Sequence, residues 1–205
     1  MRQSPERRQE VLDAANRMIA AQGLAKFSML ALAQELGMSK ETLYAWFGSK
    51  GALMEELVRG NAGQAMAVLR QALERPVESA AALERMLAQF CRLLLGLLMS
   101  ERSIALNRGA IHMSEGPGFG QTLRSQGRDE VIRQLKRVMD QAVRAGVLRQ
   151  EPTEPMAEVL IALALRDWQL ERLLGRMGEP RPAQLSRRAA EAAGLFMRLY
   201  AGTGG

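Results

Sequence analysis

The chain contains 205 residues, 47% of them hydrophobic and only 4% aromatic, and carries a formal net charge of +6. Its length suffices for one or two domains with a packed core, and its charge permits a polyanionic partner without identifying one. The single cysteine, Cys91, excludes an intramolecular disulfide, and the longest apolar run, residues 93–99, is far shorter than the roughly 18 residues of a membrane-spanning helix. The charged start of the chain lacks an apolar signal segment, so we expect a soluble, cytoplasmic protein without membrane contact.

Helix-forming residues dominate the composition, and no stretch alternates polar and apolar residues with a period of two, so we predict an all-α fold. The first helix is expected to begin after Ser4, its N-cap, and to end before Gly23. Most of this helix is expected only to pack against its neighbours. Its basic start offers a further interpretation, an arm that reaches phosphates or the minor groove of DNA. The residues of this arm are Arg2, Arg7 and Arg8.

Residues 28–50 predict a helix-turn-helix followed by the start of a third helix. Ser28 stands at the N-cap position of the first of these helices. Gly37 ends that helix, because glycine accepts the positive φ that a tight turn requires. Ser39 then caps the second helix, which has two apolar residues four apart that should dock on the first helix. These docking residues are Leu43 and Phe47.

The outer face of the second helix is the candidate reading surface, because side chains near the start of such a helix reach base edges in the major groove. Lys40 can donate to guanine, Glu41 can accept from cytosine N4, and the methyl of Thr42 or Ala45 can meet a thymine methyl. The candidate DNA-contacting residues are Ser28, Ser39, Lys40, Glu41, Thr42, Tyr44, Ala45, Trp46 and Lys50.

Three of these candidates have alternatives or separate roles. Tyr44 carries a hydroxyl on a rigid arm, which suits a phosphate oxygen. Trp46 fits either a DNA backbone contact or a cover over Phe47 and the core. Lys50 follows the cap Ser49 at the N-terminus of the third helix, where the backbone already favours an anion; the alternative is an ordinary solvated lysine.

One set of residues carries a family resemblance: Ser28, Leu36, Gly37, Met38, Ser39, Thr42, Leu43, Tyr44, Phe47, Ser49, Lys50 and Leu53. Their order and spacing resemble the DNA-binding signature of the tetracycline-repressor (TetR) family of bacterial transcription regulators, although Glu41 replaces a residue that is usually small. The resemblance implies a small three-helix DNA-binding domain, residues 1–50, and a larger helical domain for effector binding and dimerisation, residues 51–205. It also implies a sequence-specific regulator, by family default a dimeric repressor that a small-molecule effector releases from its operator.

Beyond this motif, apolar spacing predicts further helices separated by glycine and proline breaks. One long helix is expected from Ser49 to Arg75. The family resemblance implies that a tilt of this helix transmits effector binding to the DNA-binding heads. The alternative is that the helix is a rigid connector. Residues 114–120 are expected to break the helix, because neither phosphate-loop pattern, G-x-G-x-x-G or G-x-x-x-x-G-K-[ST], fits them. The other helices are expected at residues 79–99, 100–113, 121–145 and 155–177, and after Pro182.

The last two helices are expected to form a homodimer interface, because small residues on the final helix allow close helix approach. A symmetric dimer would also present two reading helices to a palindrome, since one short helix reads too few bases to find a site in a genome. The alternative is that this helix pair closes the core of the monomer. The small residues are Ala189, Ala190, Ala192, Ala193 and Gly194.

The resemblance also implies a mostly apolar effector pocket with a few polar anchors. His112, the chain's only histidine, is either such an anchor or a helix cap. The candidate pocket residues are Phe90, Leu94, Met99, Leu106, Asn107, Arg108, Ile111, His112, Phe119 and Trp168.

An enzyme is not expected, because one histidine and one cysteine cannot form a multi-histidine metal cluster and no nucleophile elbow occurs. No cofactor or metal is therefore expected. The expected partners are double-stranded operator DNA, a small-molecule effector and a second copy of the chain. The competing interpretation is a helical sensor or protein-interaction module without operator-specific DNA binding.

Overall fold

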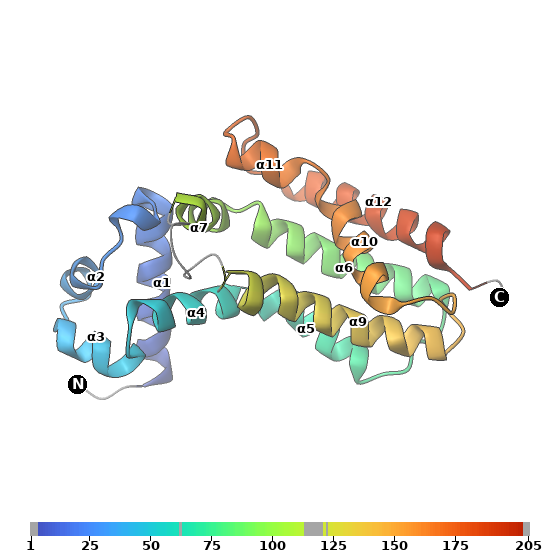
Figure 1. Ribbon diagram of the computed structural model, residues 1–205, viewed down its shortest axis with the longest axis horizontal. Coiled ribbons are helices and arrows are strands. Elements are labelled where there is room, and N and C mark those ends of the chain that lie inside the picture. Colours follow the sequence, from blue (N-terminus) through green and yellow to red (C-terminus); the bar gives the residue numbers. More distant parts are fainter. Residues whose placement is uncertain (1–3, 62, 113–120, 122, 203–205) are drawn as a thin grey trace. The chain divides into compact units, whose positions relative to one another are not determined.

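The computed structural model describes residues 4–61, 63–112, 121 and 123–202. Within these residues the fold is all-α, which confirms the predicted fold class, and the extended pairing that occurs is an isolated antiparallel bridge between Leu148 and Ala201 (Figure 1). The helices are α1 (Pro5–Gln22), η1 (Leu24–Lys26), α2 (Met29–Glu35), α3 (Lys40–Phe47), α4 (Lys50–Asn61), α5 (Gly63–Leu73), α6 (Ala80–Leu98), α7 (Glu101–His112), η2 (Leu123–Arg128, a π-helix), α9 (Asp129–Arg144), α10 (Thr153–Leu165), α11 (Trp168–Leu173) and α12 (Pro182–Tyr200).

The chain forms two compact units, each built from two stretches of sequence. The first unit comprises residues 1–61 and 100–127, and the second comprises residues 62–99 and 128–205. These units do not coincide with a division at residue 50, because α4 packs against α1 and α3, and α7 packs against α1 and η1. The assignment of DNA binding to residues 1–50 and of effector binding to residues 51–205 is a functional division and stays a prediction.

The core of the first unit joins α1, η1, α2, α3 and α4 to α7, although α7 lies far along the chain. Leu106 of α7 is buried in this core. Gly109 of the same helix approaches η1 so closely that a Cβ on it would lie 2.4 Å from the Cβ of Leu24. The close approach of α7 and η1 therefore requires glycine at this position, and α7 packs as an integral helix of the first unit.

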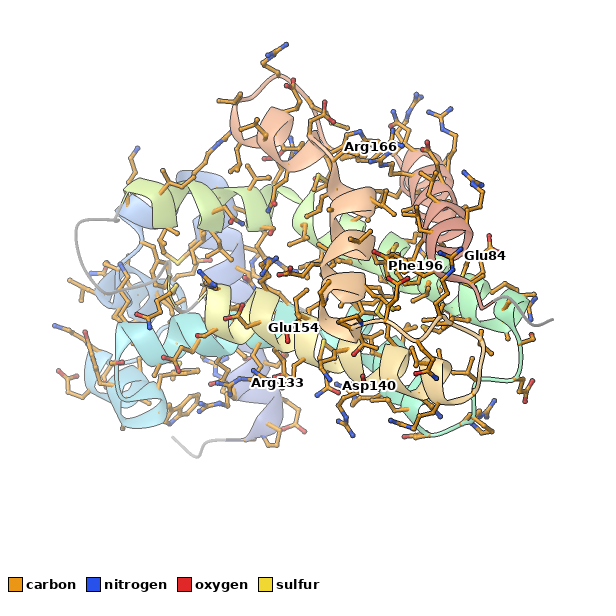
Figure 2. The ribbon with its side chains drawn as sticks, turned by 45° about the vertical axis from the view of Figure 1, so that its right-hand side comes forward. Glu84, Arg133, Asp140, Glu154, Arg166 and Phe196 are labelled. Carbon is orange, nitrogen blue, oxygen red and sulfur yellow. The ribbon has the colours of Figure 1, made fainter. Side chains whose placement is uncertain are left out.

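The second unit is organised around α6, which packs along α12 (Figure 1). Phe90 of α6 and Phe196 of α12 are fully buried in its core, and Figure 2 shows Phe196 among the packed side chains of this unit. Three of the small residues that were expected at a dimer interface belong to this core instead. For these three, the structure realises the alternative, closure of the monomer core, whereas Ala190 is exposed. The three buried residues are Ala189, Ala192 and Ala193.

The prediction of one helix over residues 155–177 is wrong, because the chain forms α10 and α11 with a break at Arg166. Arg166 has φ 43° and ψ −126°, a conformation outside the helical region. The break is stabilised from a distant helix: buried Arg188 of α12 donates to the carbonyl oxygens of Leu163 and Ala164, each at 2.9 Å. The last carbonyls of α10 thus receive the partners that a continuing helix would have supplied.

The remaining helices agree with the predictions except in two places. The helix expected over residues 121–145 includes the π-helix η2 before α9 begins at Asp129. The single helix expected from Ser49 to Arg75 is described as α4 and α5 on either side of residue 62, so its continuity stays a prediction. Residue 62, the whole expected break at residues 114–120 and the C-terminal residues 203–205 lie outside the described residues.

Candidate nucleic-acid interface

The helix-turn-helix of the first unit is fixed by serine caps and glycine turns, as its sequence predicts. Ser28 and Ser39 each accept a hydrogen bond, 3.1 Å long, from the backbone N–H three residues further on. Gly37 and Gly48 end α2 and α3 with φ values of 61° and 77°, a region that side chains with a Cβ rarely adopt. These local signals set both the length of each helix and the position of the turn between them.

Helix α3 is anchored by one face and leaves the other accessible. Leu43 and Phe47 are buried in the core of the first unit. Thr42 and Trp46 are half-buried, and Trp46 packs against that core. On α2, within the motif, Leu30 is 53% exposed, an accessible apolar side chain that the sequence patterns did not indicate. The exposed residues of α3 are Lys40, Glu41, Tyr44 and Ala45.

Two contacts organise the beginning of α3. The hydroxyl oxygens of Ser39 and Thr42 lie 2.8 Å apart and share a hydrogen bond. The Thr42 hydroxyl therefore has a partner at the N-cap of α3, and its methyl stays available for a base contact. The ammonium nitrogen of Lys40 lies 5.6 Å from the ring centroid of Tyr44, close enough for a cation–π interaction.

Lys50 is half-buried and already has a protein partner. Its ammonium donates to the backbone carbonyl oxygen of Phe27 at 2.8 Å and lies 5.4 Å from the centroid of the Phe27 ring. Burial lowers the pKa of Lys50 below its ordinary value. An ammonium has three N–H donors, so the side chain fastens the start of α4 to the segment before α2 and keeps donors for an anion. Simple solvation, the alternative in sequence, does not describe this side chain.

The arginines at the start of α1 bind inside the first unit. Arg7 donates to the carbonyl oxygen of Leu36 at 3.1 Å, and Arg8 donates to that of Trp46 at 2.9 Å. Glu56 of α4 binds the Arg8 guanidinium through both carboxylate oxygens and raises the pKa of Arg8. The basic-arm interpretation therefore fails to describe these two side chains, and Arg2 lies outside the described residues. No sequence signal identified Glu56 as a partner, because it lies far from Arg8 along the chain.

The candidate pocket residues are divided between the two units. Phe90, Leu94 and Met99 are buried and Trp168 is half-buried in the second unit. Leu106 is a core residue of the first unit, which also contains Asn107, Arg108 and the 63% exposed Ile111. Asn107 donates to the carbonyl oxygen of Ser103 at 2.8 Å. Phe119 and the side chain of His112 lie outside the described part of the chain.

The second unit carries an open surface groove of 510 Å³ between α9 and the start of α10. None of the candidate pocket residues lines this groove. Its lining residues are Lys136, Pro152, Thr153, Glu154, Pro155 and Glu158. Among the described residues, no helix is long and apolar enough to cross a bilayer, and no group of three or more His, Cys, Asp or Glu side chains is placed to hold a metal ion.

A capped helix-turn-helix with a polar, accessible second helix defines the class of helix-turn-helix DNA-binding proteins. Comparison with known families identifies the branch. Residues 11–57 match the family described as bacterial regulatory proteins, tetR family. Residues 85–202, more than half of the chain, match the family described as AefR-like transcriptional repressor, C-terminal domain. The chain therefore belongs to the TetR family and is a DNA-binding transcriptional regulator.

Solved structures of regulators share this fold along nearly the whole chain. A TetR transcriptional regulator from Agrobacterium tumefaciens is 29% identical with a TM-score of 0.78, covering 98% of this chain and 97% of that one. The flavonoid-responsive regulator FrrA is 25% identical with a TM-score of 0.68, covering 97% and 98%. A TetR-family regulator from Pseudomonas syringae pv. tomato str. DC3000, 19% identical with a TM-score of 0.66 and covering 97% and 98%, shares the fold. The search of curated proteins found no match.

Proposed function

We propose that this protein is a dimeric, cytoplasmic repressor without enzymatic activity, which leaves its operator when a small-molecule effector binds. The observation that carries the DNA-binding part is the geometry of α3. Its apolar side is buried in the first unit, and its other side exposes Lys40, Glu41, Tyr44 and Ala45. A recognition helix contacts base edges through such residues when it lies in the major groove.

The contacts of α3 suggest a division of roles. Lys40 and Glu41 are the direct readers, because a cation binds the guanine acceptors and a carboxylate accepts from cytosine N4. Thr42 and Ala45 contribute methyl contacts, since the Thr42 hydroxyl is paired with Ser39. Tyr44 donates to a phosphate oxygen. Ser28 and Ser39 act through their caps at the helix starts nearest DNA.

Lys50 and Trp46 have mixed roles in this proposal. The Lys50 ammonium binds a phosphate with the donors left beside its bond to the Phe27 carbonyl. Trp46 chiefly covers the core of the first unit, against which its half-buried side chain packs. Lys50 therefore contributes affinity for every DNA sequence, and Trp46 contributes stability to the helix that reads.

The outward faces of α10 and α12 form the homodimer interface. Two small residues on these faces, Ala162 and Ala190, are exposed, which leaves space for close helix approach in a two-fold pair. The substitution Ala190→Arg would place a long charged side chain in that interface. We expect it to give a monomer in light scattering, whereas Ala81→Arg, at an exposed alanine of α6, leaves the dimer intact.

Effector binding is assigned to the second unit and to the residues that the matched C-terminal family covers. Phe90, Leu94, Met99 and Trp168 are the candidates within that unit. The name of FrrA, the flavonoid-responsive regulator with a similar structure, makes a flavonoid the first probe to try. The expected response is loss of operator binding when a flavonoid such as naringenin is added to the complex.

The central experiment is fluorescence anisotropy of the purified protein with DNA from upstream of its own gene. A scrambled duplex is the control, and the titration is repeated across salt concentrations. A specific regulator should bind the upstream duplex at least about a thousandfold more tightly than the scrambled one. Equal and steeply salt-dependent binding to both would leave only electrostatic adhesion at that site. If a random-sequence library also yields no preferred duplex, the alternative of a sensor or interaction module replaces this proposal.

A further inference from the structure

The start of α1 holds the end of the recognition helix through a side-chain clamp formed by Arg8 and Glu56. The Nε and Nη2 atoms of Arg8 donate to the two carboxylate oxygens of Glu56 at 2.7 and 2.5 Å. Its Nη1 donates to the backbone carbonyl oxygen of Trp46 at 2.9 Å. The guanidinium carbon lies 4.2 Å from the centroid of the Phe47 ring. One side chain of α1 thus contacts α3 twice and α4 twice.

We infer that Arg8 is a positioning residue for DNA reading, which fixes the orientation of α3 and joins that helix to α4 through Glu56. This inference rests on the proposed function and adds to it a residue that does not touch DNA. The adjacent Arg7 makes a parallel contact with the carbonyl oxygen of Leu36 at the end of α2. Neighbouring arginines therefore bind the C-terminal ends of both helices of the motif.

The length of α3 explains why such a clamp matters. Helix α3 has 8 residues, and isolated helices shorter than about 12 to 15 residues are marginal in water. Its last carbonyls lack helical partners and lie at the negative end of the helix dipole, which a cation stabilises. Leu43 and Phe47 fix which face is buried. The Arg8 bond to the Trp46 carbonyl and its stacking on Phe47 fix the far end, and so the tilt with which the N-terminal readers meet the bases.

The chemistry of the clamp leaves Arg8 poorly suited to a phosphate contact. Of the five N–H donors of a guanidinium, at least three are directed at Glu56 and Trp46. The Glu56 carboxylate also neutralises the positive charge of Arg8 that would otherwise attract a phosphate. Salt bridges of this bidentate form are geometrically specific, since a planar guanidinium and a planar carboxylate define each other's orientation.

The other half of the clamp gives the positioning a second consequence. Glu56 lies on α4, and the chain passes from the first unit into the second after the end of that helix. A shift of α4 at Glu56 would move the Arg8 guanidinium and, through it, the end of α3. The clamp is thus a physical route by which a change in α4 alters how α3 meets DNA.

The sign of one substitution distinguishes positioning from direct electrostatics. Glu56→Gln removes a negative charge from the first unit, so electrostatics alone predicts tighter binding to every duplex. Positioning predicts the opposite for specific DNA, because the amide cannot hold the guanidinium through two carboxylate oxygens. The variants are Glu56→Gln, Arg8→Gln and the double variant, with Arg17→Gln as the control for lost charge at an exposed position of α1.

The measurement compares affinity for a duplex that the wild-type protein enriches from a random-sequence library with affinity for its scrambled version. Each clamp variant should lower this ratio about tenfold, the cost of roughly one lost base contact, and the double variant should lower it no further. The slope of log affinity against log salt should stay unchanged. Arg17→Gln should leave the ratio as it is. If Arg8→Gln flattens the salt slope by about one unit while Glu56→Gln tightens binding, Arg8 is a phosphate contact and the inference is wrong.

Hydrogen exchange of the backbone amides supplies a readout that does not depend on DNA. In Arg8→Gln, the amides at the end of α3 should exchange faster than in the wild type and in Arg17→Gln, while those in the middle of α1 stay protected. Unchanged exchange in α3, or an unchanged affinity ratio, overturns the positioning role. A wild-type protein that enriches no duplex overturns the proposed function instead, and the exchange pattern then decides whether the clamp still orients α3.

Discussion

Each unit of this molecule uses an arginine to complete the end of a helix, but the two arginines lie in different surroundings. In the first unit, Arg8 is half-buried, shares its charge with the Glu56 carboxylate and binds the end of α3. In the second unit, Arg188 is only 5% exposed and binds the last carbonyls of α10 at 2.9 Å. Its carboxylate neighbour, Glu191, is more distant, at 3.4 Å.

The difference separates a role in function from a role in folding. Burial lowers the pKa of Arg188, whereas hydrogen bonding to Glu56 raises that of Arg8. Buried charged and polar groups cost free energy when they lose a hydrogen-bond partner. The packing of the second unit therefore depends on the bonds between Arg188 and the carbonyls of α10. The clamp in the first unit lies nearer to solvent, where an ion pair adds little stability but still fixes an orientation.

The largest expected effect is on the stability of the second unit. The substitution Arg188→Met keeps the unbranched apolar part of the side chain but removes the guanidinium, which leaves the carbonyls of Leu163 and Ala164 without their donor. We expect a loss of about 2 to 5 kcal/mol in the free energy of unfolding. Urea denaturation followed by Trp168 fluorescence in a Trp46→Phe background would measure it, because the Trp168 ring centroid lies 5.7 Å from the Arg188 guanidinium.

Two controls belong to this measurement. The adjacent Arg187 is exposed on the same helix, and Arg187→Met should change the free energy of unfolding by no more than about 0.5 kcal/mol. Arg8→Gln should cost about 1 kcal/mol, because its ion pair is partly solvated. If Arg8→Gln destabilises the protein as much as Arg188→Met, the contrast between the two arginines is wrong.

The same contrast explains which parts of the structure could be predicted from sequence. The bounds of α1 to α3 follow from local signals, since a serine cap and a terminal glycine act within a few residues. The break at Arg166 depends on Arg188, which lies on another helix, and no local pattern near Arg166 indicates it. The close approach of Gly109 to Leu24, which places α7 in the first unit, is likewise a contact between distant segments. The side chains assigned to DNA and effector contacts stay predictions, because their partners are other molecules.

Two glycines, one in each unit, allow a comparison in which the expected change in stability is intermediate. In the first unit, Gly109→Ala would place a Cβ 2.4 Å from the Cβ of Leu24, so a helix must shift, at about 1 to 3 kcal/mol. In the second unit, the Cβ of Gly194→Ala would meet the ends of two flexible side chains, Glu84 at 3.3 Å and Arg198 at 3.9 Å. Alanine also favours the helix, so this change should be neutral or stabilising by up to about 1 kcal/mol. Thermal unfolding of both variants is the measurement, and equal destabilisation would contradict the packing described for α7.

Two serine caps, one in each unit, form a closely matched pair with a smaller expected effect on stability. Ser39 caps α3 in the first unit and Ser79 caps α6 in the second, with hydrogen bonds of 3.1 and 3.2 Å to backbone N–H groups. Replacing either by alanine should cost about 1 kcal/mol of stability. Only Ser39→Ala should also weaken binding to the enriched duplex, since it frees the beginning of the reading helix. A comparable loss of DNA affinity in Ser79→Ala, measured by anisotropy at a temperature where both variants are folded, would contradict this assignment.

The smallest expected effect concerns lysines and is visible mainly in the salt dependence of DNA binding. Lys50→Ala removes one phosphate contact per subunit, so it should weaken binding to all sequences alike and lower the salt slope by about one unit per subunit. Lys136→Ala in the second unit removes an equal charge that is paired with Asp140 at 2.9 Å, and it should leave the slope unchanged. Lys50 also holds the Phe27 carbonyl, immediately before the cap of α2. If Lys50→Ala changes base preference while the slope stays the same, then Lys50 acts by holding α2 in place, as Arg8 holds α3, and the phosphate role is wrong.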